Sequence, residues 1–211
     1  MNNNMKTEPM EKKFQLKLSR SYYLYKASTD FLISLILLIL LSPIFLFFCI
    51  VIPIDSAGSP FYTQLRLGKG GKSFTLLKLR SMYANAEKDG PQWTGVNDSR
   101  ITRVGKFIRH TRIDEIPQLL NVLKGDMSLV GPRPERPFFY QKFSQTVPEF
   151  QKRLLVKPGI TGWAQVNGGY DLTPKEKLAL DLYYIQHRSI SLEIKIIFLT
   201  MLIIFTGNGA R

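Results

Sequence analysis

Cysteine and histidine are scarce in this sequence, and their scarcity narrows the chemistry that it can support. The single cysteine, Cys49, excludes an internal disulfide and a cysteine-based metal site. The two histidines, His110 and His187, lie far apart in the chain, so a zinc site is not expected. The sequence also has no internal repeat and no low-complexity tract. Its 211 residues are therefore expected to form one compact domain with additional elements.

Acidic residues are likewise few. The chain has 16 aspartates and glutamates against 29 lysines and arginines, a formal net charge of +13. The excess is greatest in residues 56–137, where 14 basic residues stand against 7 acidic ones. Such a field attracts polyanions. Charge alone therefore leaves three ligand classes open: nucleic acid, anionic lipid headgroups and nucleotide diphosphates.

A long uncharged run occupies residues 31–54, between Asp30 and Asp55. Its 24 residues are enough to cross a hydrocarbon core of about 30 Å at about 1.5 Å per helical residue. It is too long for a secretory signal, and no small-residue cleavage site follows it before Asp55. Ser42-Pro43 lies at its middle. Proline removes a helical hydrogen bond there, and the serine hydroxyl can satisfy the freed carbonyl.

The basic flanks of this run favour a re-entrant membrane hairpin. A spanning helix would place one basic flank outside, against the positive-inside bias. A helix–break–helix arrangement over residues 21–55 keeps both flanks on the cytoplasmic face, and we predict this arrangement. A kinked spanning helix and a buried helix of a soluble core are the alternatives. Residues 1–20 are predicted to be a basic, largely disordered tail, and residues 56–211 to form the remaining domain.

Two strands are predicted over residues 61–67 and 74–80, joined by a glycine-rich hairpin turn. Gly71-Lys72-Ser73 matches the end of a Walker motif, but Arg66 stands where the first glycine of that motif belongs. A plain turn is therefore favoured over a phosphate-binding loop. Helices are predicted over residues 101–113, 116–123, 138–156, 174–187 and 194–205. The last is expected to be a core helix or an interfacial one.

The most informative stretch is residues 109–134, which contains the adjacent acids Asp114 and Glu115. A basic cluster precedes the pair, and an apolar helical pattern that Gly125 ends follows it. The pair is thus predicted at a helix N-terminus, where the dipole favours anions. An Asp-Glu pair by itself is more often a helix cap and a surface acid. The basic cluster, the helix start and a constrained arginine downstream weaken that interpretation and point to a reactive carboxylate in a phosphate-binding environment.

A constrained arginine follows the same helix. Gly131-Pro132-Arg133-Pro134 places Arg133 between two prolines, each of which fixes its own backbone φ angle. The guanidinium therefore starts out partly oriented for an anionic group. This segment and the acidic pair together predict one anion-directed site.

Nine ordered motifs carry a family resemblance. They are Asp30 with Ser42-Pro43, Gln64-x-Arg66-x-Gly68, Lys78-Leu79-Arg80-Ser81-Met82, Arg100-Ile101-Thr102-Arg103-Val104-Gly105, Asp114-Glu115-Ile116-Pro117-Gln118-Leu119, Asn121-Val122-Leu123-Lys124-Gly125-Asp126-Met127-Ser128, Gly131-Pro132-Arg133-Pro134, Lys157-Pro158-Gly159-Ile160-Thr161-Gly162-Trp163 with Gln165-Val166-Asn167-Gly168, and Asp181-Leu182-Tyr183-Tyr184. Through them, residues 26–206 resemble the bacterial sugar transferase family, the monotopic phosphoglycosyl transferases. The short chain resembles the small form that has the catalytic domain alone.

The resemblance implies a fold and a reaction. The implied fold is α+β and membrane-associated (monotopic), with a re-entrant helix–break–helix, interfacial amphipathic helices and a small mixed α/β catalytic core. The implied reaction moves a sugar-1-phosphate from a UDP-sugar to a polyprenol phosphate, undecaprenyl phosphate, and releases UMP. It would proceed by a ping-pong mechanism through a covalent aspartyl-phosphosugar and require Mg²⁺. It would be the first membrane step of polysaccharide or glycoconjugate assembly, at the cytoplasmic face of the bacterial inner membrane.

The same resemblance assigns roles to residues and partners. It implies that Asp114 is the nucleophile and Glu115 its partner, and that both contact magnesium. The implied substrate-binding residues are Lys78, Arg80, Arg109, Pro132, Arg133 and Pro134, and Ser42 and Pro43 form the hairpin break. The implied partners are the UDP-sugar, the polyprenol phosphate and membrane lipid, with a homodimer and downstream glycosyltransferases as further candidates and no nucleic acid.

The competing hypothesis is a basic, membrane-tethered module that binds anionic lipid or nucleic acid without catalysis. It predicts an affinity that falls steeply with salt and does not depend on Asp114. A third hypothesis, a polytopic enzyme subunit, uses residues 31–54 as a true span. Arg112, next to the acidic pair, has no assigned role in any of these.

Overall fold

The computed structural model describes residues 18–206, apart from residues 89, 91, 93–94 and 96–97. The prediction of a disordered tail falls mainly on residues outside this part of the chain. The helices are α2 Arg20–Asp55, α3 Arg103–His110, α4 Gln118–Leu123, α5 Pro137–Thr146, α6 Trp163–Val166, α7 Pro174–His187 and α8 Ile190–Thr206. The 3₁₀ turns are η1 Lys69–Gly71, η2 Ile113–Glu115, η3 Phe150–Leu155 and η4 Gly169–Asp171.

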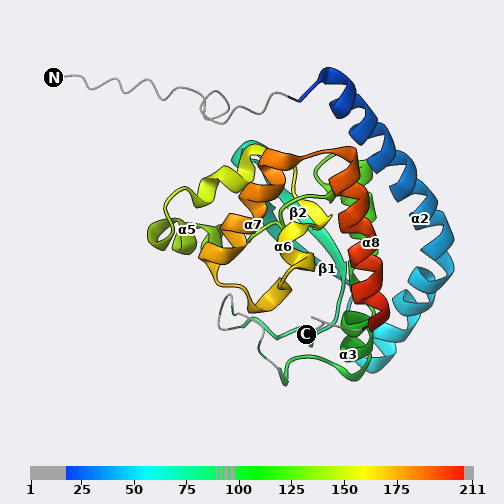
Figure 1. The fold of residues 1–211 in the computed structure, drawn as a ribbon. Helices are drawn as coiled ribbons and strands as arrows, with labels where there is room; N and C mark the ends of the chain where they lie inside the picture. The colour runs from blue at the N-terminus through cyan, green and yellow to red at the C-terminus, as the bar shows by residue number, and fades with distance from the viewer. Residues whose placement is uncertain (1–17, 89, 91, 93–94, 96–97, 207–211) are drawn as a thin grey trace.

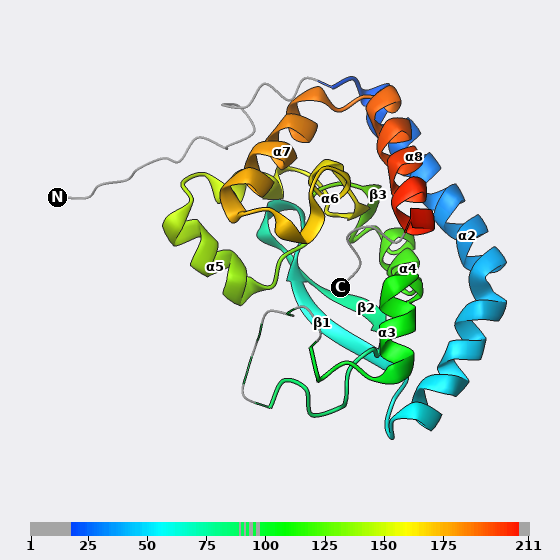
Figure 2. The ribbon, with the colours of Figure 1, turned by 60° about the horizontal axis from the view of Figure 1, so that its bottom comes forward.

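Helix α2 curves along one side of the molecule, with α8 and α3 beside it (Figures 1 and 2). It remains helical through Ser42-Pro43, so the prediction of a helix–break–helix is wrong on this point: α2 is one continuous, bowed helix. Pro43 has no N–H, so it cannot donate the helical hydrogen bond to the carbonyl oxygen of Ile39. Ser42 Oγ donates to that oxygen instead, at 2.7 Å. The predicted role of the serine hydroxyl is thereby confirmed, and it explains why the helix can continue.

The outer side of α2 is apolar and exposed. Leu40, Ile50 and Ile54 are 66%, 67% and 79% exposed. Among the described helices, α2 alone is long and apolar enough to cross a membrane, by length and composition. An exposed apolar surface of this extent is unfavourable in water. The helix therefore indicates membrane association.

Two small sheets form the strand layer. Strands β1 Phe61–Leu67 and β2 Ser73–Leu79 pair antiparallel, with Phe61 opposite Leu79 and Leu67 opposite Ser73. The turn between them contains Gly70 and Gly71 with φ angles of 67° and 78°, which only glycine adopts readily. A strand follows Ser73, so the hairpin turn is confirmed and the Walker alternative is excluded.

The second sheet pairs β3 Ser128–Val130 with β4 Gly159–Thr161 in parallel. The backbones around it are in unusually close contact. A Cβ on Gly131 would lie 2.5 Å from the Lys157 carbonyl oxygen, and one on Gly159 would lie 2.1 Å from Gly131 N. These two positions therefore accept glycine only, and they hold the segment after β3 against the start of β4.

The main core lies where β3 meets α4, α7 and α8. Its buried members are Ile116, Leu119, Leu129, Val130, Leu155, Val156, Tyr184, Ile185 and Ile196. Leu38, Leu41 and Phe45 of α2 pack against this cluster. One face of α2 thus contributes to the core while the other stays apolar and exposed.

The structure shortens two predicted helices. The helix expected over 101–113 is α3, and Arg112 then takes a left-handed backbone conformation with a φ of 60°. The helix expected over 138–156 is divided into α5 and η3, with Glu149 at a φ of 67° and Pro148, which has no N–H, before it. The predicted start of α7 is confirmed: Thr173 and Glu176 form a capping box, with Pro174 at the first position.

Candidate active site around Asp114 and Glu115

The acidic pair lies in η2, the 3₁₀ turn that comes just before α4. The left-handed backbone at Arg112 ends the α3 segment, and Pro117 starts α4 with a φ of −60°. The sequence placed the pair at a helix N-terminus, and the structure places it one turn earlier. Both acids are nearly inaccessible, with Asp114 5% and Glu115 8% exposed. Two adjacent buried carboxylates require compensating positive charge.

Strand β2 supplies the first cation. Lys78 Nζ lies 3.0 Å from Asp114 Oδ2 and 3.0 Å from Glu115 Oε1, so one ammonium group bridges the pair. Because side chains alternate across a strand, the neighbouring Leu79 points to the other face and is buried in the core beside α2 and α3. Consecutive residues of β2 therefore have different functions: Lys78 contacts the acidic pair, and Leu79 packs the strand into the core.

The segment after β3 supplies the second cation. Arg133 Nη2 donates to Glu115 Oε1 at 2.5 Å. Four of the residues selected from the sequence, Lys78, Asp114, Glu115 and Arg133, therefore meet in one cluster. Charge-assisted hydrogen bonds of this kind fix the carboxylates in position.

Glu115 has an altered acidity. Burial by itself would raise the pKa of the Glu115 carboxyl, but the charges of Arg133, Lys78 and Arg112 together hold that pKa well below its usual range. Arg112 thus acquires an electrostatic role that the sequence did not reveal. The glutamate is therefore ionised at neutral pH.

The structure places Arg80 elsewhere. Its guanidinium donates to the carbonyl oxygens of Ser56, Ala57 and Gly58, at 2.5, 2.8 and 3.1 Å, and so closes the C-terminal end of α2. It is not brought to the acidic pair, and we assign it to the junction between α2 and β1. Arg109, on α3, has Nη1 3.5 Å from Ser81 Oγ.

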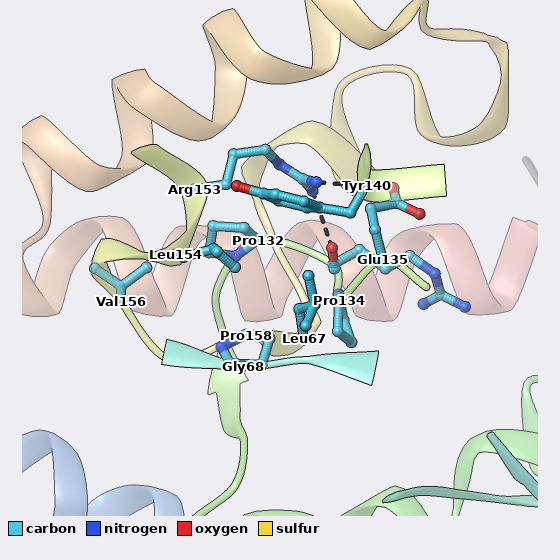
Figure 3. Close-up of a pocket in the computed structure, with 11 residues that line it drawn as sticks. Leu67, Gly68, Pro132, Pro134, Glu135, Tyr140, Arg153, Leu154, Val156 and Pro158 are labelled. Carbon is cyan, nitrogen blue, oxygen red and sulfur yellow. Dashed lines mark hydrogen bonds and ion pairs between the residues drawn. The ribbon is translucent and has the colours of Figure 1, made fainter. Parts of the chain in front are cut away.

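Pro132 and Pro134, on either side of Arg133, line a small pocket (Figure 3). Glu135, Tyr140 and Arg153 form other parts of its wall. Arg153 Nη2 donates to the carbonyl oxygen of Arg133 at 2.9 Å. Both prolines therefore lie at the rim of a cavity, and their predicted part in substrate binding stays a prediction.

Two residues of this wall, Glu135 and Arg153, belong to a charge network that the sequence did not reveal. Arg153 Nε donates to Asp181 Oδ2 at 2.6 Å, and Lys177 Nζ donates to Glu135 Oε1 at 3.0 Å. Burial by itself would raise the pKa of the Glu135 carboxyl. The charges of Lys177, Arg153 and Arg66 lower it by more than burial raises it, so the pKa lies below its ordinary value. The only signal in the sequence was Asp181, which stood in a motif without an assigned contact.

The described part of the chain gathers no group of three or more histidine, cysteine, aspartate or glutamate side chains. Asp114 and Glu115 are thus the only acids at this site that could contact a metal among the described residues. Taken together, a buried carboxylate pair compensated by Lys78 and Arg133 and an exposed apolar helix indicate a membrane-associated protein with a charged, buried site.

Comparison with known proteins identifies the group to which this protein is related. The family model described as bacterial sugar transferase matches residues 21–207. The chain belongs to this family. The match covers every element described above except the first residue of α2.

Three relatives illustrate the similarity. One is the UDP-N-acetylgalactosamine-undecaprenyl-phosphate N-acetylgalactosaminephosphotransferase of Aeromonas hydrophila, 45% identical over 90% of this chain and 46% of the relative. The other two are UDP-glucose:undecaprenyl-phosphate glucose-1-phosphate transferases. That of Escherichia coli is 35% identical over 96% of this chain and 45% of the relative, and that of Caulobacter vibrioides 39% over 89% and 72%. The chain thus spans about half the length of the first two.

We expect Glu115→Gln to lower the free energy of unfolding by about 3 kcal/mol at pH 7, because it leaves Lys78 and Arg133 without their shared anion. The difference from wild type should be fully present above the ordinary glutamate pKa of about 4.3 and should shrink as pH falls through the lower folded-state pKa. Denaturant unfolding from pH 7 to pH 3 measures it. Glu149→Gln, at a side chain 59% exposed, is the control and should change little. A difference that grew on acidification would contradict the assignment.

Proposed function

We propose that the protein transfers a sugar-1-phosphate from a UDP-sugar to a polyprenol phosphate, undecaprenyl phosphate, and releases UMP. The single observation that supports this most strongly is the bridging of Asp114 and Glu115 by Lys78, with Arg133 on the same glutamate. It places a carboxylate among cations that an incoming diphosphate can share. The names of the relatives, which are sugar-phosphate transferases acting on undecaprenyl phosphate, support the same substrates.

In the first half of the proposed reaction, an Asp114 carboxylate oxygen attacks the phosphorus that carries the sugar. A P–O bond to Asp114 forms while the bond to the UMP oxygen breaks, and UMP leaves with that electron pair. Lys78 bridges Asp114 and Glu115 at 3.0 Å each, so it can stabilise the charge that moves through this site. The hydrogen bond from Arg133 to Glu115 keeps both side chains in place beside Asp114.

In the second half, a phosphate oxygen of the polyprenol phosphate attacks the same phosphorus. The bond to Asp114 breaks, and the carboxylate is restored. Two large anionic substrates then use one small site in turn, which is the advantage of a ping-pong mechanism with a covalent intermediate. The step would begin polysaccharide or glycoconjugate assembly.

Magnesium fits this donor set. Mg²⁺ is usually bound through one or two carboxylates together with substrate phosphates and water, and Asp114 and Glu115 provide such a pair. When bound, the ion would offset the negative charge of the diphosphate. Within the described chain, these residues would hold it only with ligands from the substrate, because no third acidic side chain joins them.

The contacts of α2 support insertion from one membrane face. Near its N-terminal end, Asp30 accepts hydrogen bonds from Ser128 Oγ and Leu129 N. At its C-terminal end, Asp55 Oδ2 accepts from Val104 N at 3.1 Å. Both ends therefore contact the same catalytic domain, which a helix crossing to the far side of the bilayer could not do. We place this domain at the cytoplasmic face of the inner membrane, with α2 re-entrant and α8 at the interface.

Purified wild-type protein with Mg²⁺ should release UMP from at least one member of a panel of UDP-sugars when undecaprenyl phosphate is present. Asp114→Asn should reduce the rate at least about 10³-fold, since it removes the nucleophile. Mass spectrometry of a reaction without acceptor should find a phosphosugar on the peptide that contains Asp114. Asp171→Asn, at an exposed aspartate, is the matched control and should retain full activity. Full activity of Asp114→Asn would contradict the proposal, because another group would then have to carry the reaction. No UMP release by wild type from any donor would favour a binding module.

Removal of divalent cations with a chelator should abolish UMP release, and added Mg²⁺ should restore it, because the carboxylate cannot approach the diphosphate while its charge is unscreened. The thermal unfolding midpoint should move little, since Lys78 and Arg133 already compensate both acids in the protein itself. UMP release that continued at full rate in excess chelator would show that these cations suffice without a metal.

Cysteines placed at the exposed positions Ser21 and Ser59, in a Cys49→Ser background, report the side of the membrane on which each end of α2 lies. A membrane-impermeant maleimide should label neither site in intact cells and both in inverted membrane vesicles. Both ends are then cytoplasmic, as the contacts with one domain require. Labelling of the two sites from opposite sides would refute the re-entrant arrangement and establish a spanning helix.

A further inference from the structure

The position of Arg133 depends on how β3 is held. Arg133 comes three residues after the end of the strand at Val130, and prolines on both sides limit its backbone. Gly131 N donates to Thr161 O at 2.9 Å, and Gly159 N donates to Pro132 O at 3.0 Å. With so little freedom in the segment, a displacement of β3 would be transmitted directly to the guanidinium.

One edge of β3 pairs with β4, and its other edge faces α2. Ser128 and Val130 are the residues in register with β4, so the N–H of Leu129 points away from that strand. Asp30 of α2 satisfies it: Oδ1 accepts from Leu129 N at 3.2 Å, and Oδ2 accepts from Ser128 Oγ at 2.7 Å. A single carboxylate of the membrane helix thus serves two buried donors of the strand that leads to Arg133.

Asp30 is itself held in place. Lys26 Nζ lies 3.6 Å from Asp30 Oδ1 and 2.6 Å from Glu193 Oε2 on α8. Glu193 Oε1 also lies 2.7 Å from the hydroxyl of Tyr184, and that hydroxyl is 3.0 Å from the carbonyl oxygen of Val130. Two polar routes therefore run from the first turns of α2 and α8 to the end of β3. The side chains of Lys26, Asp30 and Glu193 are 13–17% exposed, so solvent competes little with these bonds.

We propose that Asp30 is a positioning residue that acts through β3 to place Arg133 against Glu115. The effect of Asp30 on catalysis rests on the proposed function, whereas its effect on the position of β3 can be measured without substrate. Asp30 lies at the last charged position before the apolar run of α2. The same Asp30 carboxylate then fixes α2 against the domain and sets the orientation of Arg133.

The first arm of the test measures amide hydrogen exchange in the full-length protein in nanodiscs, without substrate. Asp30→Ala should increase exchange of residues 128–134 at least tenfold and leave the α4 peptide unchanged. Asp30→Asn, which keeps one acceptor, should give an intermediate increase and also serves if the alanine variant folds poorly. Asp55→Ala is the matched control, because it removes a carboxylate of α2 that contacts α3 instead. Unchanged exchange at 128–134 in both Asp30 variants would overturn the proposal.

The second arm is a double-mutant cycle on UMP release. Asp30→Ala should slow wild type by about 10- to 100-fold, the range expected for a displaced catalytic group. In an Arg133→Lys background it should slow the reaction by no more than about twofold further, because the group through which it acts is already impaired. Asp55→Ala should have the same effect in both backgrounds. Equal effects of Asp30→Ala in both backgrounds would overturn the proposal. If wild type releases no UMP from any donor, the proposed function fails, and the exchange arm still decides the role of Asp30.

Discussion

Two adjacent carboxylates cannot both be buried and ionised unless cations lie between or beside them. This constraint governs the arrangement of the catalytic domain. Lys78 has to reach the pair from β2, which fixes the hairpin against η2, and Arg133 has to reach it from the segment after β3. The glycines at 131 and 159 permit the backbone contact that brings this segment close enough. The elements around the site are thus arranged by a local charge balance as much as by apolar packing.

The sequence predicts those features that local chemistry determines. The hairpin turn at Gly70 and Gly71 and the capping box at Thr173 depend on residues within a few positions, and both are confirmed. The grouping of Asp114, Glu115 and Arg133 was also anticipated, because all three lie within one motif-rich stretch. Arg80 shows the limit. It comes two residues after Lys78, just past the end of β2, yet it reaches the carbonyls that follow α2. Periodicity places both residues on one face and cannot tell which partner each will meet.

The remaining discrepancies have the same origin. Ser42-Pro43 predicts a break when only the lost backbone hydrogen bond is counted, but the serine hydroxyl replaces it and the helix continues as a bow. The network of Glu135, Arg153, Lys177 and Asp181 joins residues of η3, of α7 and of the segment before α5. Each residue alone looks like an ordinary surface charge in the sequence. Their burial is a property of the tertiary structure, and no spacing in the chain encodes it.

The attachment of α2 at both ends has a consequence for the surrounding lipid. A membrane helix that is not attached to a domain accommodates a change in bilayer thickness by tilting. This helix is tied to the catalytic domain by Asp30 at one end and by Asp55 and Arg80 at the other, so it cannot tilt by itself. In the re-entrant arrangement proposed above, the lipid would then absorb the hydrophobic mismatch through local deformation of one leaflet around a rigid helix. The protein would thus set the depth of its own site, and the membrane would adapt to it.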